Sequence, residues 1–244
     1  MNLKERIQKG VRLWIVSLAS LFFRRRCICC QRELMAFESG ICTFCLADMP
    51  SSYTWTSADS PADKTFWGRT EIEKVTSLFL YNGKYRSLVY SIKYRQNTAL
   101  GERLGRMLGE IIAEEDIDYI LPVPLHPRKK RQRGYNQSEI ICRGILSSLR
   151  KRIPGVRLET RLLKRKIFTN TQTRKDRIDR WKNVRNAFGV NVKRLEKLEA
   201  PLRPLHFLIV DDVLTTGATL DACATHLHNS CNCRISIATL AYVP

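Results

Sequence analysis

The segment 207–219 constrains the fold more than any other part of the chain. Residues 207–210 are apolar and bounded by polar residues, which is typical of a fully buried strand in a parallel sheet. Asp211 and Asp212 follow where such a strand would end, and open α/β sheets bind ligands outside the carboxyl ends of their strands. Small residues then lead into an apolar-periodic segment, 220–227, that predicts a helix. We therefore expect a strand–loop–helix unit with a ligand site at its turn.

The residues of this turn suit a phosphorylated sugar. Backbone N–H groups, hydroxyls and the start of the helix would bind a 5′-phosphate through Thr215, Thr216, Gly217, Ala218 and Thr219. The two carboxylates before them would accept hydrogen bonds from ribose hydroxyls. This is the layout of a site for phosphoribosyl pyrophosphate (PRPP). The alternative is an ordinary turn with a chance acidic pair, but order, spacing and residue types together favour the ligand site.

Positive charge is concentrated in one part of the chain. The 244 residues carry a formal net charge of +19, and the window 128–185 holds 20 Lys and Arg against four Asp and Glu, which is +16 of that total. Such a concentration predicts a basic face or groove, whose natural partners are nucleic acid or a polyphosphate ligand. A solubilising surface is the alternative.

The nine cysteines do not read as a secreted disulfide scaffold, because their number is odd and four of them form two Cys-x-x-Cys pairs. The pairs are Cys27 with Cys30 and Cys42 with Cys45. Four thiolates at this spacing can close tetrahedrally around a structural Zn²⁺, whereas four reduced structural cysteines are the alternative. Cys29 lies inside the first pair, and its role stays open.

A second anion site is expected after another strand. Residues 117–123 read as a strand, and the basic residues that follow precede Gly134, which permits close approach of a ligand. We interpret this segment as a loop in which Lys129 and Arg133 neutralise a pyrophosphate, Arg with bidentate geometry. A solvated basic loop is the alternative.

The remaining pattern predicts an α/β fold with a mostly parallel sheet. Further strands are expected at residues 75–81 and 235–242, and further helices at 85–92, 100–112 and 137–149. The predicted organisation is an amphipathic segment at 1–26, a four-cysteine zinc finger at 27–50, a connector at 51–73 and the α/β domain at 74–244.

Two segments are ambiguous. Residues 172–188 are charged and have few apolar anchors, so they are either a mobile flap over a charged ligand or an exposed helix or loop. The apolar part of the first segment, 11–23, is too short for a membrane span and precedes three arginines. It would pack on the protein itself or lie on an anionic membrane surface. A cytoplasmic protein is expected, either free or peripheral at the inner face of the membrane.

Taken in order, these elements resemble the ComF family of competence proteins, a branch of the type I phosphoribosyltransferases. The resemblance covers nearly all of the chain from Cys27 onward. It rests on the two Cys pairs, on Tyr90-Ser-Ile-Lys93-Tyr-Arg, on Pro122-Val-Pro-Leu with Arg133-Gly-Tyr-Asn-Gln137, on Gln172, Arg180, Asn183 and Ala187-Phe188, and on the acidic pair with its Thr-rich loop.

The resemblance implies a five-stranded parallel core of the type I phosphoribosyltransferase kind, a PRPP-like ligand with Mg²⁺, and a zinc finger. It assigns the ribose to Asp211 and Asp212, the 5′-phosphate to residues 215–219, and the pyrophosphate to residues 124–134. The further ligand residues that it implies are Lys93, Arg133, Gly134, Asn136, Gln137, Gln172, Arg180 and Asn183. It also implies uptake of single-stranded DNA, with a DNA-uptake helicase or other competence proteins as partners. The sequence departs from the family at Lys129, where Arg is common, and in the charged residues after Gln172, where an apolar one is usual.

Two hypotheses of different class remain. The first is a phosphoribosyltransferase, in which Mg²⁺ and the cations Lys129 and Arg133 stabilise a departing pyrophosphate beside Asp211 and Asp212. The second is a DNA-binding competence factor that keeps the fold as a scaffold or sensor. Aromatic residues within the basic window would then stack on unpaired bases, namely Tyr135, Phe168 and Trp181. A nucleobase-salvage transferase is a variant of the first, and no sequence feature identifies an acceptor.

Overall fold

The computed structural model describes residues 25–54, 60–114, 116–165, 187–198 and 202–244. The chain divides into two compact units between Met49 and Pro50. None of the helices in these ranges is long and apolar enough to cross a membrane.

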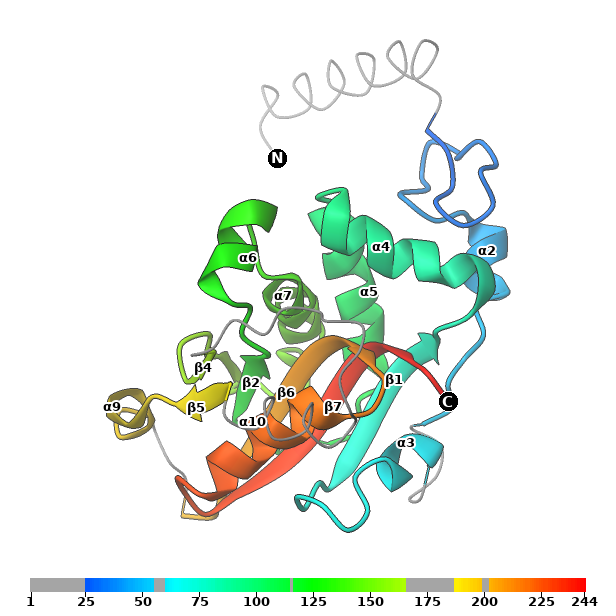
Figure 1. Ribbon diagram of the computed structural model, residues 1–244. Helices are drawn as coiled ribbons and strands as arrows, with labels where there is room; N and C mark the ends of the chain where they lie inside the picture. Colours follow the sequence, from blue (N-terminus) through cyan, green and yellow to red (C-terminus); the bar gives the residue numbers. More distant parts are fainter. Residues whose placement is uncertain (1–24, 55–59, 115, 166–186, 199–201) are drawn as a thin grey trace, which may run out of the picture. The chain divides into compact units, whose positions relative to one another are not determined.

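The larger unit is built on a five-stranded parallel sheet with the order β1-β7-β6-β2-β3. Figure 1 shows the first four of these strands side by side. Its strands are β1 (Lys74–Leu80), β2 (Tyr119–Pro122), β3 (Arg157–Leu158), β6 (Leu205–Leu214) and β7 (Cys233–Tyr242). The two longest strands, β6 and β7, are central and almost wholly buried. Near-continuous apolar runs are what a parallel sheet covered on both faces requires. The predicted α/β class with a parallel sheet is confirmed.

Helices cover both faces of this sheet. Helices α5 (Thr98–Ile111) and α7 (Gln137–Leu149) pack on one face, and α10 (Ala218–His228) packs on the other (Figure 1). The smaller helices are η1 (Gly83–Tyr85), α3 (Pro61–Lys64), α4 (Arg86–Tyr94), α6 (Pro127–Arg133) and α9 (Val192–Leu195). An antiparallel hairpin is formed by β4 (Leu163–Arg165) and β5 (Phe188–Val190).

Helices α5 and α7 touch backbone to backbone. A Cβ atom added at Gly144 would lie 2.2 Å from the carbonyl oxygen of Glu102, and one at Gly105 would lie 2.3 Å from that of Ile141. Both distances are shorter than van der Waals contact, so only glycine permits this approach. The close pair fixes α7, whose first turn faces the carboxyl end of β6.

Residues 50–73 belong to the larger unit. Ser51 forms a β-bridge with Phe79, and Ala62 and Phe66 are buried in the core on the α10 side of the sheet. Helix α3 begins with a capping box between Ser60 and Asp63, and Asp63 also accepts a hydrogen bond from the backbone of Val75 at 2.7 Å. This part of the chain is therefore packed against the sheet.

Two local predictions were wrong. The strand expected to end at residue 210 continues to Leu214, because β7 runs alongside as far as Tyr242 and supplies backbone partners. The acidic pair therefore lies within the last part of β6. The segment expected to be a basic loop contains α6, which Pro127 opens, His126 caps and Gly134 closes in the left-handed conformation at φ 88°.

The smaller unit is described from Arg25 to Met49. Its backbone forms isolated β-bridges between Arg26 and Glu33 and between Ser39 and Ile41, followed by helix α2 (Thr43–Ala47). Cys27, Ile41, Cys42 and Cys45 are its buried core.

Candidate functional site

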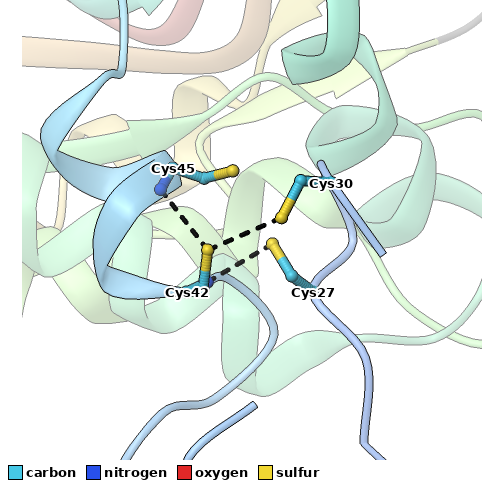
Figure 2. A group of neighbouring side chains, drawn as sticks. All are labelled: Cys27, Cys30, Cys42 and Cys45. Carbon is cyan, nitrogen blue, oxygen red and sulfur yellow. Dashed lines mark hydrogen bonds between the residues drawn. The ribbon is translucent and has the colours of Figure 1, made fainter. Parts of the chain in front are cut away.

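The four cysteines of the two pairs converge on one point, as Figure 2 shows. Their Sγ atoms all lie within 4.8 Å of one another, and those of Cys30 and Cys42 are 3.7 Å apart. Four sulfurs bound to one Zn²⁺ at about 2.3 Å in a tetrahedron are about 3.8 Å apart. The arrangement therefore fits a structural metal such as zinc. Cys29 is not a member of the group.

Backbone N–H groups point at the sulfurs. That of Cys42 donates to Cys27 at 3.3 Å, and that of Cys45 donates to Cys42 at 3.4 Å. Burial alone would raise the pKa of Cys27, but the backbone N–H groups of Cys30, Cys42 and Cys29 lower it to about 6. The buried Glu38 ties the two halves together, because it accepts hydrogen bonds from the backbone of Met35 at 2.8 Å and of Thr43 at 2.6 Å. Thiolate character is thus favoured at Cys27, whereas burial raises the pKa of Cys42 and of Cys45.

In the larger unit, a cleft of about 240 Å³ opens at the carboxyl end of β2 and β6. It is defined by Lys93, Tyr94, Val123, Pro124, Leu125, Lys129, Arg133, Gln137, Arg165, Asp211, Asp212 and Thr219. Helices α4 and α6, the start of α7, the end of β4 and the start of α10 surround it. The position is where open α/β sheets bind their ligands.

The acidic pair lies at the bottom of this cleft. Asp212 is 4% exposed, and its Oδ1 oxygen forms an ion pair with Lys93 Nζ at 2.9 Å. Its other oxygen, Oδ2, is buried and has no hydrogen-bond partner among the described residues. Asp211 Oδ1 accepts from the hydroxyl of Ser138 at 3.0 Å and from the backbone N–H of Asp212 at 2.8 Å. A buried acceptor without a donor costs free energy, and a ligand hydroxyl or a cation would offset that cost.

The titration of the pair reflects its surroundings. Burial, helped by the negative charge of Asp212, raises the pKa of Asp211 to about 7, although Lys93 and the donors to Asp211 oppose this. Burial alone would lower the pKa of Lys93, but the charges of Asp212 and Asp211 raise it. Lys93 is thus held as a cation beside the carboxylates.

Two cations of α6 face the cleft together. Lys129 and Arg133 are four residues apart, so a helix brings them to one face, while Lys130 and Arg131 line a separate open hollow of about 510 Å³. Burial lowers the pKa of Lys129, and the charges of Arg165 and Arg133 lower it further. Like charges held this close are what an anion with several phosphate oxygens would neutralise.

The predicted phosphate loop lies between β6 and α10. Gly217 adopts φ 72° and caps α10, and a Cβ there would lie 3.0–3.1 Å from Thr65 and Phe66. Glycine is needed both for the conformation and for the contact. Thr215 and Thr216 are exposed, and the carbonyl of Thr216 accepts from Arg69 at 2.8 Å. The loop is therefore open to solvent at its two threonines, while Arg69 binds its backbone and Thr65 and Phe66 lie beside Gly217.

The structure brings seven of the predicted site residues into the cleft: Lys93, Lys129, Arg133, Gln137, Asp211, Asp212 and Thr219. Six other predicted residues do not line it: Gly134, Asn136, Thr215, Thr216 and Gly217 lie in adjoining turns, and Ala218 begins α10. Asn136 is buried and caps α7, and its amide donates to the carbonyl of Val123 at 3.0 Å, so it positions the cleft wall. Gln172, Arg180 and Asn183 lie outside the described residues.

Sequence reasoning missed two residues here. Arg165 enters the cleft from the hairpin strand β4, with its guanidinium 5.2 Å from the ring of Phe188, and nothing distinguishes it in a stretch rich in Lys and Arg. Ser138 binds Asp211 from the first turn of α7, and only the tertiary contact reveals it. Tyr94 lines the cleft within a motif that had been noted for Lys93.

No protein-family model matches the chain. Curated relatives are similar to it over most of its length. The DNA utilization protein YhgH of Salmonella typhimurium is 26% identical over 213 residues, which is 80% of this chain and 86% of the relative. Competence protein F of Haemophilus influenzae is 26% identical over 219 residues, or 82% and 89% of the two chains. The YhgH protein of Escherichia coli K12 is 25% identical over 210 residues, or 80% and 86%.

These relatives carry two names, competence protein and DNA utilization protein. Each match extends over at least four fifths of both chains, so the similarity is not confined to the phosphate loop or to the cysteine pairs. The motifs and the relatives together support a ComF-family protein.

Proposed function

We propose that the protein binds PRPP or a related phosphoribosyl ligand with Mg²⁺ in the cleft, and that it serves DNA uptake. The main support for this ligand is the buried Asp212. One of its oxygens pairs with Lys93, and the other has no donor among the described side chains and backbone. The names of the relatives support the role in DNA uptake, since one is a competence protein and the others are DNA utilization proteins.

Each chemical group of PRPP has side chains or backbone groups of suitable charge and hydrogen-bonding capacity in or beside the cleft. The ribose hydroxyls would donate to Asp211 and Asp212, the pyrophosphate would lie against Lys129 and Arg133, and the 5′-phosphate would bind the loop that ends at Thr219. Lys93 would hold the Asp212 carboxylate in position through their ion pair.

The residues also fit Mg²⁺. This ion prefers carboxylate oxygens together with the oxygens of a bound phosphate ligand, and the unpartnered Asp212 Oδ2 is such a carboxylate oxygen. When bound, Mg²⁺ would neutralise charge on the pyrophosphate. If the protein is a transferase, the cations Lys129 and Arg133 stabilise the same departing charge as the bond between ribose C1 and the pyrophosphate oxygen breaks.

The test is a double variant, Asp211→Asn with Asp212→Asn. Both amides keep the shape of the carboxylates but lose the charge, so we expect Mg²⁺-dependent PRPP binding to fall by at least a hundredfold while the protein stays folded. Calorimetric titration with PRPP measures the affinity, and Asp221→Asn is a matched control, since Asp221 is equally buried but does not line the cleft. Unchanged affinity in the double variant would sink the assignment.

A second candidate function is a DNA-binding competence factor without catalysis. The outer face of α6, with Lys130 and Arg131, supports it, because these two cations line an open hollow that the acidic pair does not line. Pyrophosphate release from PRPP, measured with and without single-stranded DNA, separates the two. Release stimulated by DNA supports the enzyme, and DNA binding without any release supports the factor.

We also propose that the cysteine group holds one structural Zn²⁺. A closed thiolate site adds folding free energy on the order of 10 kcal/mol in zinc-finger peptides. Cys42→Ser should therefore release the metal and unfold residues 27–49, while the α/β unit keeps its melting transition. Cys142→Ser is the matched control, since Cys142 is a buried cysteine of the other unit. Elemental analysis that finds no zinc in the reduced protein would refute the site.

A further inference from the structure

Helix α4 exposes two tyrosines that the proposed ligand does not use. Tyr90 is 53% exposed and Tyr94 is 63% exposed, and their ring centroids are 4.9 Å apart. They are four residues apart, so they lie on one side of the helix. Two neighbouring aromatic rings left to solvent beside a cleft form a surface that is complementary to another planar ring.

A guanidinium group flanks each ring. The Cζ atom of Arg95 is 5.8 Å from the centre of the Tyr90 ring, and that of Arg133 is 5.2 Å from the centre of the Tyr94 ring. We call the four side chains, Arg95, Tyr90, Tyr94 and Arg133, the aromatic row. Its inner end belongs to the cleft, because Tyr94 and Arg133 line it, and its outer end is solvent-facing.

This combination suits a strand of nucleic acid. Unpaired bases stack on tyrosine rings and on guanidinium planes, and the phosphates between bases pair with arginine charge. Two successive rings with a cation at each end provide more surface than one free base covers. The cationic outer face of α6, with Lys130 and Arg131, adjoins Arg133 on the same helix and would continue the charge.

We propose that the aromatic row binds a single-stranded nucleic acid by base stacking and carries one base to the mouth of the cleft. The delivery of that base rests on the proposed function, because it makes the base the group presented to a phosphoribosyl ligand. The stacking does not, since Tyr90 and Tyr94 can hold bases without PRPP. The site differs from the aromatic residues that the basic window suggested.

Fluorescence anisotropy with a labelled dT oligonucleotide, without PRPP, tests the binding. Tyr90→Ala and Tyr94→Ala should each weaken binding about tenfold, while Tyr94→Phe should bind like the wild type because the ring remains. Trp67→Ala is the control, since Trp67 is equally exposed at 63%, has Lys64 over its ring at 5.3 Å and does not line the cleft. Tyr90 also lies outside the cleft lining, so Tyr90→Ala should keep PRPP affinity within twofold.

An abasic oligonucleotide of the same length separates stacking from charge. It carries the same phosphates, so weak binding of this probe supports the row, and binding equal to that of the dT probe overturns it. Loss of affinity in Trp67→Ala as large as in the tyrosine variants would also overturn it, as would free thymine or adenine competing as well as the oligonucleotide. Wild-type DNA binding with no PRPP binding would refute only the proposed function.

Discussion

The two edges of the parallel sheet both carry charged side chains, but they satisfy them differently. At the amino-terminal edge, His206 is 0% exposed, and its ring nitrogens contact Asp116 Oδ1 at 2.8 Å and the Ser236 hydroxyl at 3.0 Å. At the carboxyl-terminal edge, Asp212 keeps a buried oxygen without a partner among the described residues. The buried polar side chain at the amino-terminal edge is hydrogen-bonded within the protein, whereas the one at the carboxyl-terminal edge keeps an oxygen that a ligand could bind.

Arginine pairs complete the amino-terminal edge. Arg203 binds both oxygens of Asp118 at 2.9 and 3.0 Å, and Arg234 binds Glu73 at 2.5 and 2.7 Å. Arg234 also contacts Asp116. Burial alone would raise the pKa of Asp116, but His206 and Arg234 lower it. At the other edge burial raises the pKa of Asp211 to about 7. An aspartate is therefore stabilised as an anion at the amino-terminal edge, at Asp116, whereas the ionised form is disfavoured at the carboxyl-terminal edge, at Asp211.

The order Asp116, His206, Ser236 has the hydrogen bonding of an acid–base–nucleophile triad. It cannot act as one here, because both His206 and Ser236 are 0% exposed and no substrate atom can reach the hydroxyl. The hydrogen bonds of His206 and the complete burial of His206 and Ser236 mark this network as structural. Chemistry is expected at the edge where the polar groups are incompletely paired.

The largest effect is expected from breaking the amino-terminal edge at His206. His206→Ala removes two hydrogen bonds and leaves a cavity, so we expect a loss of about 3 kcal/mol in the free energy of unfolding. PRPP affinity should stay within twofold, since the change lies at the far end of β6. Urea unfolding and calorimetric titration measure the two quantities. If PRPP affinity falls and stability does not, the roles of the two edges are reversed.

Asp211→Asn should raise the free energy of unfolding, whereas His206→Ala should lower it. Because the folded pKa of Asp211 is about 7, against about 4 in the unfolded chain, its protonated form favours folding. That contribution is complete below pH 4 and is lost as the pH rises to 7. The uncharged amide escapes the loss, so the variant should be more stable than the wild type by about 2 kcal/mol at pH 8 and by less at pH 5. Thermal unfolding at both values, without Mg²⁺ or PRPP, checks this, and a gap that does not widen with pH contradicts it.

Much of the fold could be predicted because it depends on local periodicity. The pattern of residues 137–149 gave helix α7 with its observed bounds, and apolar runs located β1, β2, β6 and β7. Strands β3, β4 and β5 have two or three residues each, which is too short to show a period of two. Helix α6 has no apolar face to reveal it, although proline and glycine at its ends were usable signals.

Some residues of the candidate site could likewise be predicted from the sequence, and others could not. The acidic pair lies in the last part of a strand, and the glycine loop and the α6 cations follow strands in the sequence, so the parallel topology alone places them at one edge. Arg165 and Ser138 reach the cleft from elements whose position depends on packing. His206 was unremarkable in the sequence, because its partners Asp116 and Ser236 lie 90 and 30 residues away and only the strand register brings them together.

The smallest effect is expected from Asp116→Asn, which sharpens the contrast with Asp211. The folded pKa of Asp116 is lowered, so its ionised form favours folding, and that stability is present above about pH 4 and lost as the pH falls through the folded value. Asp116 is 40% exposed, and solvent screens its pairs with His206 and Arg234. We therefore expect the variant to lose about 1 kcal/mol at pH 7 and to approach the wild type below pH 4, where the wild-type carboxyl is itself protonated. Urea unfolding at pH 7 and well below pH 4 measures the difference. A gap that widens on acidification would mean that Asp116, like Asp211, is penalised as an anion, and the distinction between the two edges would fail.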